Sequence, residues 1–449
     1  MKRYFLAAVG LGLVGAAFAA GRPLKISVTC DRADAIYKVG ETATFSVTAA
    51  DANGSAATSG TVTVVLDNFG TKRICERTHD LAKGNPFAVS GSLGEPGFLR
   101  VTVKAEKIAN PALDSEDFIW SAAFSPERIR QSAARPADFD AFWAAEKARL
   151  AREVPLDPRV EKDEARSVGD KRLDWYRASF ATFGRRVYAW LAKPKGATGA
   201  KLPAEVHVPG AGFGRWSVLG SATPGRITLC FSVFPFEQTT DCAGRERELN
   251  AWDKTLEAKW GMKRYCRAGI AGERRDDYFY HSVILGFDRA VDWLAAQPDV
   301  DAGNIVYHGS SQGGAFGLYL LALNRRFARG LVMVPALTGH FQHLDGRQDG
   351  WPRFFDNADA AHHAAIARNA PYYDGVNFAA AIRCPVRFMV GFADPICAPG
   401  AVYSAYNACG SSDKAIVNCV GMGHHVDWNE FQKLRPWLEG VVQGVGDGR

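Results

Sequence analysis

The feature that most constrains this chain is a short glycine-rich turn at residues 309–314, which read Gly-Ser-Ser-Gln-Gly-Gly. The apolar run 305–308 before it predicts a buried strand, and the run 315–322 after it predicts a helix. A strand, a G-x-S-x-G turn and a helix form a nucleophile elbow, in which a sharp turn holds a serine exposed. The segment therefore predicts a nucleophilic serine rather than an ordinary glycine-rich loop.

Two adjacent serines compete for this role, and the glycines decide between them. Centred on Ser311, both flanking positions are glycine, Gly309 and Gly313. Centred on Ser310, the flanking residues would be a histidine and a glutamine, whose side chains do not fit so tight a turn. Ser311 is the predicted nucleophile.

Partners for this serine follow it in the chain. Asp394 comes just after the predicted strand 386–390, and His424 comes on a glycine-rich loop after the predicted strand 415–418. In enzymes with this elbow the acid and then the histidine follow the serine in this order. An imidazole takes the serine proton and a carboxylate orients the imidazole, so all three are needed. A plainer role for Asp394 is to cap the next helix.

The first residues are typical of a signal peptide. Lys2 and Arg3 precede an apolar run at 5–18 that ends in small residues, which predicts cleavage near Ala19. The run is too short and too rich in glycine for a membrane anchor, and no later segment has the length and hydropathy of a membrane span. We expect a secreted or periplasmic protein.

Charge and cysteine usage exclude several classes of function. The formal net charge of +6 on 449 residues is small, and no basic run reaches five residues, so nucleic-acid binding has no support. The nine cysteines form no C-x-x-C pair, and the two His-His pairs, 362–363 and 424–425, lack the spacing of metal ligands. We expect no metal and no cofactor. Export permits disulfides, but the pairing is left open, and an odd count leaves at least one thiol free.

The pattern of strands predicts two domains after the signal peptide. Residues 20–124 contain short alternating strands such as 24–30 and 99–104, separated by turn residues, which favours a small all-β, immunoglobulin-like sandwich. We expect this domain to be a structural spacer, with carbohydrate binding as the alternative. In residues 125–449 strands alternate with helices, which is typical of an α/β domain with a mostly parallel sheet.

From about residue 136 to 430 the sequence resembles the acetyl xylan esterase and cephalosporin C deacetylase family of α/β hydrolases. The resemblance implies an α/β-hydrolase domain with Ser311 as nucleophile, Asp394 as acid and His424 as base. The matching segments are 138–143, 283–300, 309–314, 372–378 and 391–399.

Three positions depart from the family pattern. Gly-His-Glu at the histidine is Gly-His-His at 423–425, the Arg-Gly-Gln motif is missing from 229–236, and His-Gly-Tyr at the oxyanion loop is Pro-Gly-Ala at 209–211. The missing motif means that the ring-like assembly of the family is not carried over, and oligomer formation is left open. Backbone N–H groups form an oxyanion hole, so Gln312 and Ala211 are the expected donors.

These observations predict an exported serine esterase that removes acetyl groups from acetylated oligo- or polysaccharides. A serine peptidase of the prolyl-oligopeptidase type shares the triad, although such enzymes generally carry a larger accessory domain. A non-catalytic carbohydrate-binding scaffold on a hydrolase fold is the other alternative, and it would not need Ser311, Asp394 and His424 together.

Overall fold

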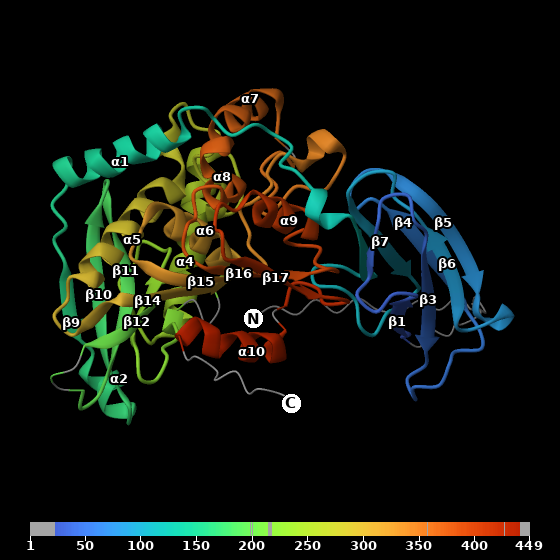
Figure 1. Ribbon diagram of the computed structural model, residues 1–449, viewed down its shortest axis with the longest axis horizontal. Coiled ribbons are helices and arrows are strands. Elements are labelled where there is room, and N and C mark those ends of the chain that lie inside the picture. Colours follow the sequence, from blue (N-terminus) through green and yellow to red (C-terminus); the bar gives the residue numbers. More distant parts are fainter. Residues whose placement is uncertain are drawn as a thin grey trace, which may run out of the picture.

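The computed structural model describes residues 23–197, 199, 201–213, 218–356, 358–425 and 427–440. The predicted signal peptide lies outside the described residues. The described part of the chain begins with a unit of strands and one short 3₁₀ turn, and a larger unit of strands and helices follows it (Figure 1). Among the described residues, no helix has both the length and the apolar character that crossing a membrane requires.

The first unit, here called the β unit, consists of two sheets that share one core. A three-stranded sheet has the order β1-β3-β6, and a five-stranded sheet has the order β2-β8-β7-β4-β5. Side chains alternate between buried and half-buried along β3, as expected for a strand with one face on a core. Its strands are β1 (Lys25–Cys30), β2 (Ile36–Tyr37), β3 (Ala43–Ala50), β4 (Thr61–Asp67), β5 (Arg73–Asp80), β6 (Phe87–Gly91), β7 (Gly97–Lys104) and β8 (Phe118–Phe124).

The second unit is built on a nine-stranded sheet with the order β17-β16-β15-β14-β12-β13-β11-β10-β9. Strands β12 to β17 pair in parallel, but β9, β10 and β11 pair antiparallel. The sheet is therefore mixed, because residues 183–184 turn the chain directly from β10 into β11. Its strands are β9 (Arg159–Lys162), β10 (Leu173–Thr182), β11 (Arg185–Pro194), β12 (Leu202–Val208), β13 (Ile227–Ser232), β14 (Val300–Ser310), β15 (Phe327–Met333), β16 (Val386–Gly391) and β17 (Lys414–Cys419).

Helices cover both faces of this sheet. In Figure 1, α1, α5, α6 and α8 lie above the sheet, and α10 lies below it. The α5 helix presents an apolar face to the core, with Val283, Phe287 and Val291 fully buried. The helices are α1 (Phe139–Glu153), α2 (Glu164–Gly169), α4 (Cys242–Trp260), α5 (Phe279–Ala295), α6 (Gln312–Leu323), α7 (Ala360–Asn369), α8 (Gly375–Ala379), α9 (Pro399–Ala408) and α10 (Trp428–Glu439), and single 3₁₀ turns are at 81–83, 126–128, 265–267, 275–277, 342–345 and 370–373.

The two units are joined by a shared apolar core. Phe392, Val402 and Tyr403 of the second unit are buried among the side chains of the β unit. The Phe98 ring of β7 lies edge-on to the Phe392 ring, with 5.2 Å between the ring centroids. Backbone pairing adds to the contact, because Thr71 donates from its N–H to the carbonyl of Gly346 at 3.0 Å. The two units therefore pack against each other through a common core. The predicted domain boundary near residue 124 stays a prediction.

Candidate active site

The predicted nucleophile Ser311 lies at the sharp turn between β14 and α6. Its backbone has φ 59° and ψ −119°, a conformation that a non-glycine residue rarely adopts. A Cβ at Gly313 would lie 1.9 Å from the carbonyl oxygen of Val208, and one at Gly309 would lie 2.5 Å from that of Gly313. Only glycine fits at these two positions, which is the frame that the sequence predicted. The strained turn places Ser311 beyond the carboxyl ends of the parallel strands.

Asp394 lies on the loop that leaves β16, and its side chain is fully buried. One carboxylate oxygen accepts hydrogen bonds from the backbone N–H groups of Ile396 at 2.8 Å and Cys397 at 2.9 Å. The next helix begins after Ala398, so Asp394 does not cap it. The second carboxylate oxygen takes part in neither of these bonds and faces His424.

His424 connects the acid to the serine. Its Nδ1 lies 2.8 Å from Oδ2 of Asp394, and its Nε2 lies 2.9 Å from Oγ of Ser311. Because a carboxylate accepts hydrogen bonds, Nδ1 carries the proton and the Nε2 lone pair faces the serine hydroxyl. His425 is exposed, and within the described residues its backbone N–H donates to the carbonyl oxygen of Gly423. The structure brings His424, and not His425, to the serine.

Gln312 and Ala211 are the expected oxyanion donors, and both lie close to Ser311 in the fold. Gln312 follows the serine at the first turn of α6, and Ala211 lines the same cavity as the serine. The side chain of Gln312 has a further role, since its Nε2 donates to the carbonyl oxygens of Pro209 at 3.3 Å and Gly210 at 3.5 Å. This amide ties the elbow to the loop that carries Ala211.

Two buried tyrosines hold that amide in place. The hydroxyls of Tyr265 and Tyr280 both donate to Oε1 of Gln312, at 2.9 and 2.5 Å. Tyr265 also accepts from the backbone N–H of Gly212 at 3.4 Å. Burial raises the pKa of both tyrosines well above the ordinary value, so both hydroxyls keep their protons and donate. The loop at 209–212 is therefore fixed through three buried side chains.

Ser311 and His424 open into a cavity of about 340 Å³. This volume is within the range of small-molecule sites, about 300–1,000 Å³. Its walls come from both units, because the loop between β7 and β8 contributes Leu113 and Asp114. The other lining residues are Ala211, Gly212, Phe213, Asp253, Arg264, Tyr265, Cys266, Trp351 and Ile396.

A family profile described as acetyl xylan esterase (AXE1) matches residues 127–439, which is more than half of the chain. The chain belongs to the acetyl xylan esterase family. It is a carboxylic ester hydrolase, as the sequence predicted. A curated relative, the acetyl esterase Axe7A of Xylanibacter ruminicola, is 27% identical over 368 residues, which are 81% of this chain and 79% of the relative.

Solved structures of acetyl xylan esterases share the fold of this esterase. The enzyme from Paenibacillus sp. R4 superposes with a TM-score of 0.57 at 22% identity, over 70% of this chain and 98% of that one. The enzyme from Thermoanaerobacterium sp. JW/SL YS485 gives a TM-score of 0.56 at 19% identity, over 71% of this chain and 98% of that one. The second unit of this esterase is thus an α/β-hydrolase fold.

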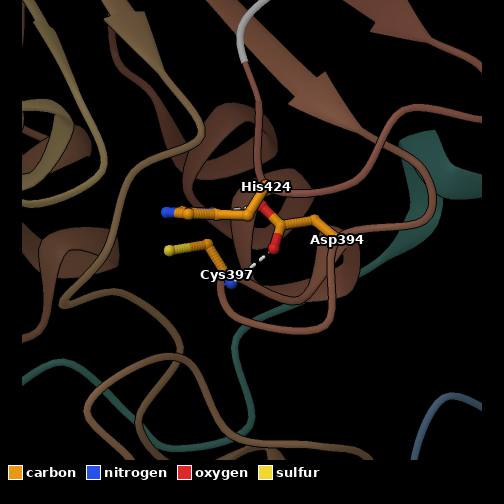
Figure 2. A group of neighbouring side chains, drawn as sticks. All are labelled: Asp394, Cys397 and His424. Carbon is orange, nitrogen blue, oxygen red and sulfur yellow. Dashed lines mark hydrogen bonds and ion pairs between the residues drawn. The ribbon is translucent and has the colours of Figure 1, made fainter. Parts of the chain in front are cut away.

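The thiol of Cys397 lies beside Asp394 and His424. Figure 2 shows its sulfur and the outer ring nitrogen of His424 on the same side, away from Asp394. Asp394, Cys397 and His424 each place a potential metal ligand within 4.8 Å of the others. Burial raises the pKa of the Cys397 thiol well above its ordinary value, and zinc binds the deprotonated form. Asp394 and His424 already bond to each other, so the three residues fit a hydrogen-bonded site better than a metal site.

Sequence reasoning missed several parts of this site. It assigned Gln312 through its backbone N–H and did not foresee the role of its side chain. Tyr265 and Tyr280 belong to no recognisable sequence motif, and Leu113 lies in a unit expected to be a spacer.

All nine cysteines lie within the described residues, and all are free thiols.

Proposed function

We propose that this protein is an exported serine esterase that removes acetyl groups from acetylated carbohydrates, with acetylated xylan as the substrate class. The observation that carries the proposal is a pair of hydrogen bonds, one between Asp394 and His424 and one between His424 and Ser311, at the wall of a cavity. The names of the relatives, an acetyl esterase and two acetyl xylan esterases, support the acetyl group and the xylan.

In the first half of the reaction, Oγ of Ser311 attacks the carbonyl carbon of the acetyl ester while Nε2 of His424 takes the hydroxyl proton. The carbonyl oxygen becomes an oxyanion, and the backbone N–H groups of Gln312 and Ala211 donate to it. Asp394 stabilises the imidazolium through Nδ1. The intermediate collapses, His424 gives its proton to the sugar oxygen, and the deacetylated sugar leaves.

In the second half, a water molecule replaces the sugar. His424 takes one proton from the water, whose oxygen attacks the acetyl carbon of the acyl-enzyme. The C–O bond to Ser311 breaks, the serine oxygen regains its proton from His424, and acetate leaves. Each step uses groups of this chain, the ester and water.

The localisation and the domain division belong to the same proposal. We propose that a signal peptide cleaved near Ala19 exports the enzyme, so that it is secreted or periplasmic. We propose that residues 20–124 form an immunoglobulin-like sandwich domain and residues 125–449 the catalytic domain. The two sheets of the β unit and their common core support this division.

The deciding experiment measures acetate release by the purified enzyme from acetylated xylo-oligosaccharides, with nitrophenyl acetate and nitrophenyl octanoate in parallel. We expect acetate release from the oligosaccharides and faster cleavage of the acetyl ester than of the octanoyl ester. Activity on nitrophenyl acetate without release from any acetylated oligosaccharide would refute the carbohydrate substrate. A faster rate on the octanoate would favour a lipase-like enzyme. Cleavage of prolyl peptides would favour the peptidase alternative.

A further inference from the structure

The cavity at Ser311 continues into a second cavity of about 520 Å³. The two cavities share five lining residues, so they form one cleft that runs from the serine along the interface between the two units. The second cavity, here called the distal cavity, reaches from the β unit to the loop at 348–356. The shared residues are Leu113, Asp114, Arg264, Trp351 and Ile396.

The lining of the distal cavity is rich in cations. Lys263, Arg264, Arg267 and Arg353 line it, against two carboxylates, those of Asp114 and Asp356. Elsewhere on this chain, charged side chains form numerous ion pairs. Within the described part of the chain, however, no ion pair joins any of these four cations to a carboxylate. The distal cavity therefore holds an excess of positive charge.

Two of these cations are fixed by backbone carbonyls rather than by acids. The Arg267 guanidinium donates to the carbonyl oxygen of Pro352 at 3.0 and 2.5 Å. Arg353 donates to the carbonyl oxygen of Pro395 at 2.5 Å, and its Nε is buried without a partner. Burial lowers the pKa of Arg267, the carboxylate of Asp356 raises it, and the charges of Arg264 and Arg353 lower it by smaller amounts. Like charges are thus held near one another, an arrangement that an anion would relieve.

Arg264 stands where the two cavities meet. Its backbone has φ 71°, which is unusual for a residue with a side chain. No hydrogen bond of the described chain uses its guanidinium, and the same holds for the ammonium group of Lys263. Trp351 lines both cavities beside Arg264 and offers an apolar ring to one face of a sugar. The cleft therefore presents an aromatic side chain and two cations without a hydrogen-bond partner in the described chain, and one of them, Arg264, also lines the cavity at Ser311.

We propose that the distal cavity binds a carboxylate-bearing sugar, a uronic acid, attached to the acetylated saccharide whose ester lies at Ser311. The inference rests on the proposed function. A guanidinium recognises a carboxylate through two parallel hydrogen bonds, and an ammonium group adds charge. Arg264 and Lys263 are the specificity-determining residues, and they favour acidic over neutral substrates.

The test compares two substrates that differ only in charge. Acetylated xylo-oligosaccharides that carry one uronic acid are assayed beside the same oligosaccharides after reduction of the carboxyl group to an alcohol. The readout is the ratio of the two kcat/KM values for acetate release, which a general loss of activity does not change. We expect a ratio of roughly tenfold or more in favour of the acidic substrate at low salt, and a fall of this ratio as salt screens the charges.

Substitutions test which residues cause the preference for the acidic substrate. Lys263→Gln and Arg264→Gln should each lower the ratio severalfold, and the double variant should bring it close to one. Lys254→Gln, at an exposed position of α4 outside both cavities, should keep the wild-type ratio. A wild-type ratio near one, or a ratio unchanged in the double variant, would overturn the inference while leaving the deacetylase proposal intact. Cleavage of nitrophenyl acetate without acetate release from either oligosaccharide would instead refute the proposed function.

Discussion

The side-chain hydroxyl of Ser121, in the β unit, donates a hydrogen bond of 2.5 Å to the backbone carbonyl oxygen of Phe392, two residues before Asp394. Ser121 is fully buried, and the Phe392 ring lies in the core of the β unit. The loop that carries the acid is therefore held by a unit distant in sequence. We expect the position of Asp394 to depend on this contact, which would give the β unit a role beyond that of a spacer.

We expect Ser121→Ala to leave the Phe392 carbonyl without its buried donor and to destabilise the protein by about 1–3 kcal/mol. The turnover number should fall with it, since a shift of Asp394 weakens its bond to His424. Thermal unfolding and nitrophenyl acetate turnover measure the two effects. Ser90→Ala, an exposed hydroxyl of the same unit, is the control and should match the wild type in both. Unchanged stability and turnover in Ser121→Ala would show that the β unit does not support the acid loop.

Substitution of the two serines of the elbow tests the nucleophile. Ser311→Ala removes the oxygen that faces His424, and turnover should fall on the order of 10⁴-fold or more. Ser310→Ala should keep much of the activity, because Ser310 lines a different cavity on the other side of the turn. A fluorophosphonate probe should label the peptide at Ser311 in the wild type and not in the Ser311 variant. An inactive Ser310 variant beside an active Ser311 variant would show that the elbow is centred one residue earlier.

The two neighbouring histidines allow a matched comparison of the base. His424→Asn should reduce turnover about as strongly as Ser311→Ala, and the double variant should be little worse, because triad residues act as a unit. His425→Asn should lose far less, about tenfold at most, since its side chain is exposed. Steady-state kinetics on variants with wild-type circular dichroism decide between them. Loss of activity in His425→Asn alone would mean that the base is assigned to the wrong residue.

Gln312→Leu tests whether the glutamine amide positions the oxyanion loop. The change leaves the hydroxyls of Tyr265 and Tyr280 without an acceptor and releases the loop carbonyls of Pro209 and Gly210. We expect kcat to fall roughly 10–100-fold with a small change in KM, because the loss falls on the transition state.

A substitution of Tyr280, which donates a hydrogen bond to Gln312, separates the positioning role of the glutamine from an effect on folding. Tyr280→Phe removes one donor and keeps the glutamine amide, so its melting temperature should fall while kcat falls much less. If both variants lose stability and neither loses more than twofold in kcat, the glutamine has a structural role only.

The environment of Glu205 indicates how the stability of the fold changes at low pH. This carboxylate is buried in the middle of β12, 3.0 Å from Nε2 of His308 and 3.4 Å from the guanidinium of Arg435. Burial raises its pKa, but His308 and Arg435 outweigh burial, and the pKa falls to about 2. The ordinary value is 4.5, so its stabilisation is complete above pH 4.5 and is lost as the pH falls from 4.5 towards 2.

We expect the melting temperature of the wild type to drop through that window, by the equivalent of about 3 kcal/mol. Glu205→Gln should already be less stable at pH 7 by about 3–5 kcal/mol, since it removes the carboxylate partner of the buried His308 and one of the two carboxylate partners of Arg435. The difference in stability from the wild type should narrow below pH 4.5. Glu161→Gln removes an exposed carboxylate on β9 and should follow the wild-type curve. A deficit of Glu205→Gln that stays constant from pH 7 to pH 2 would contradict this account.

Local patterns in the sequence determined the elements and the order of the predicted triad. The strand before Ser311, its flanking glycines and the helix after it are contiguous, and their geometry follows from short-range sterics. The alternation of strands and helices likewise predicted the parallel strands β12 to β17, since a parallel pair needs a long crossover between its strands. Asp394 and His424 could be named because they follow strands whose carboxyl ends meet at one edge of the sheet.

Only the tertiary structure decided what surrounds these residues. The bonds of Gln312 to Tyr265 and Tyr280 join segments far apart in the chain, and no local pattern marks them. The same is true of Ser121 at the acid loop and of Arg264 in the cleft between the two units. Periodicity reports which face of an element is buried, but not which distant element covers it. The three residues of the proposed triad could therefore be named from the sequence, whereas the side chains that support them and the charge of the cleft could be seen only in the packed fold.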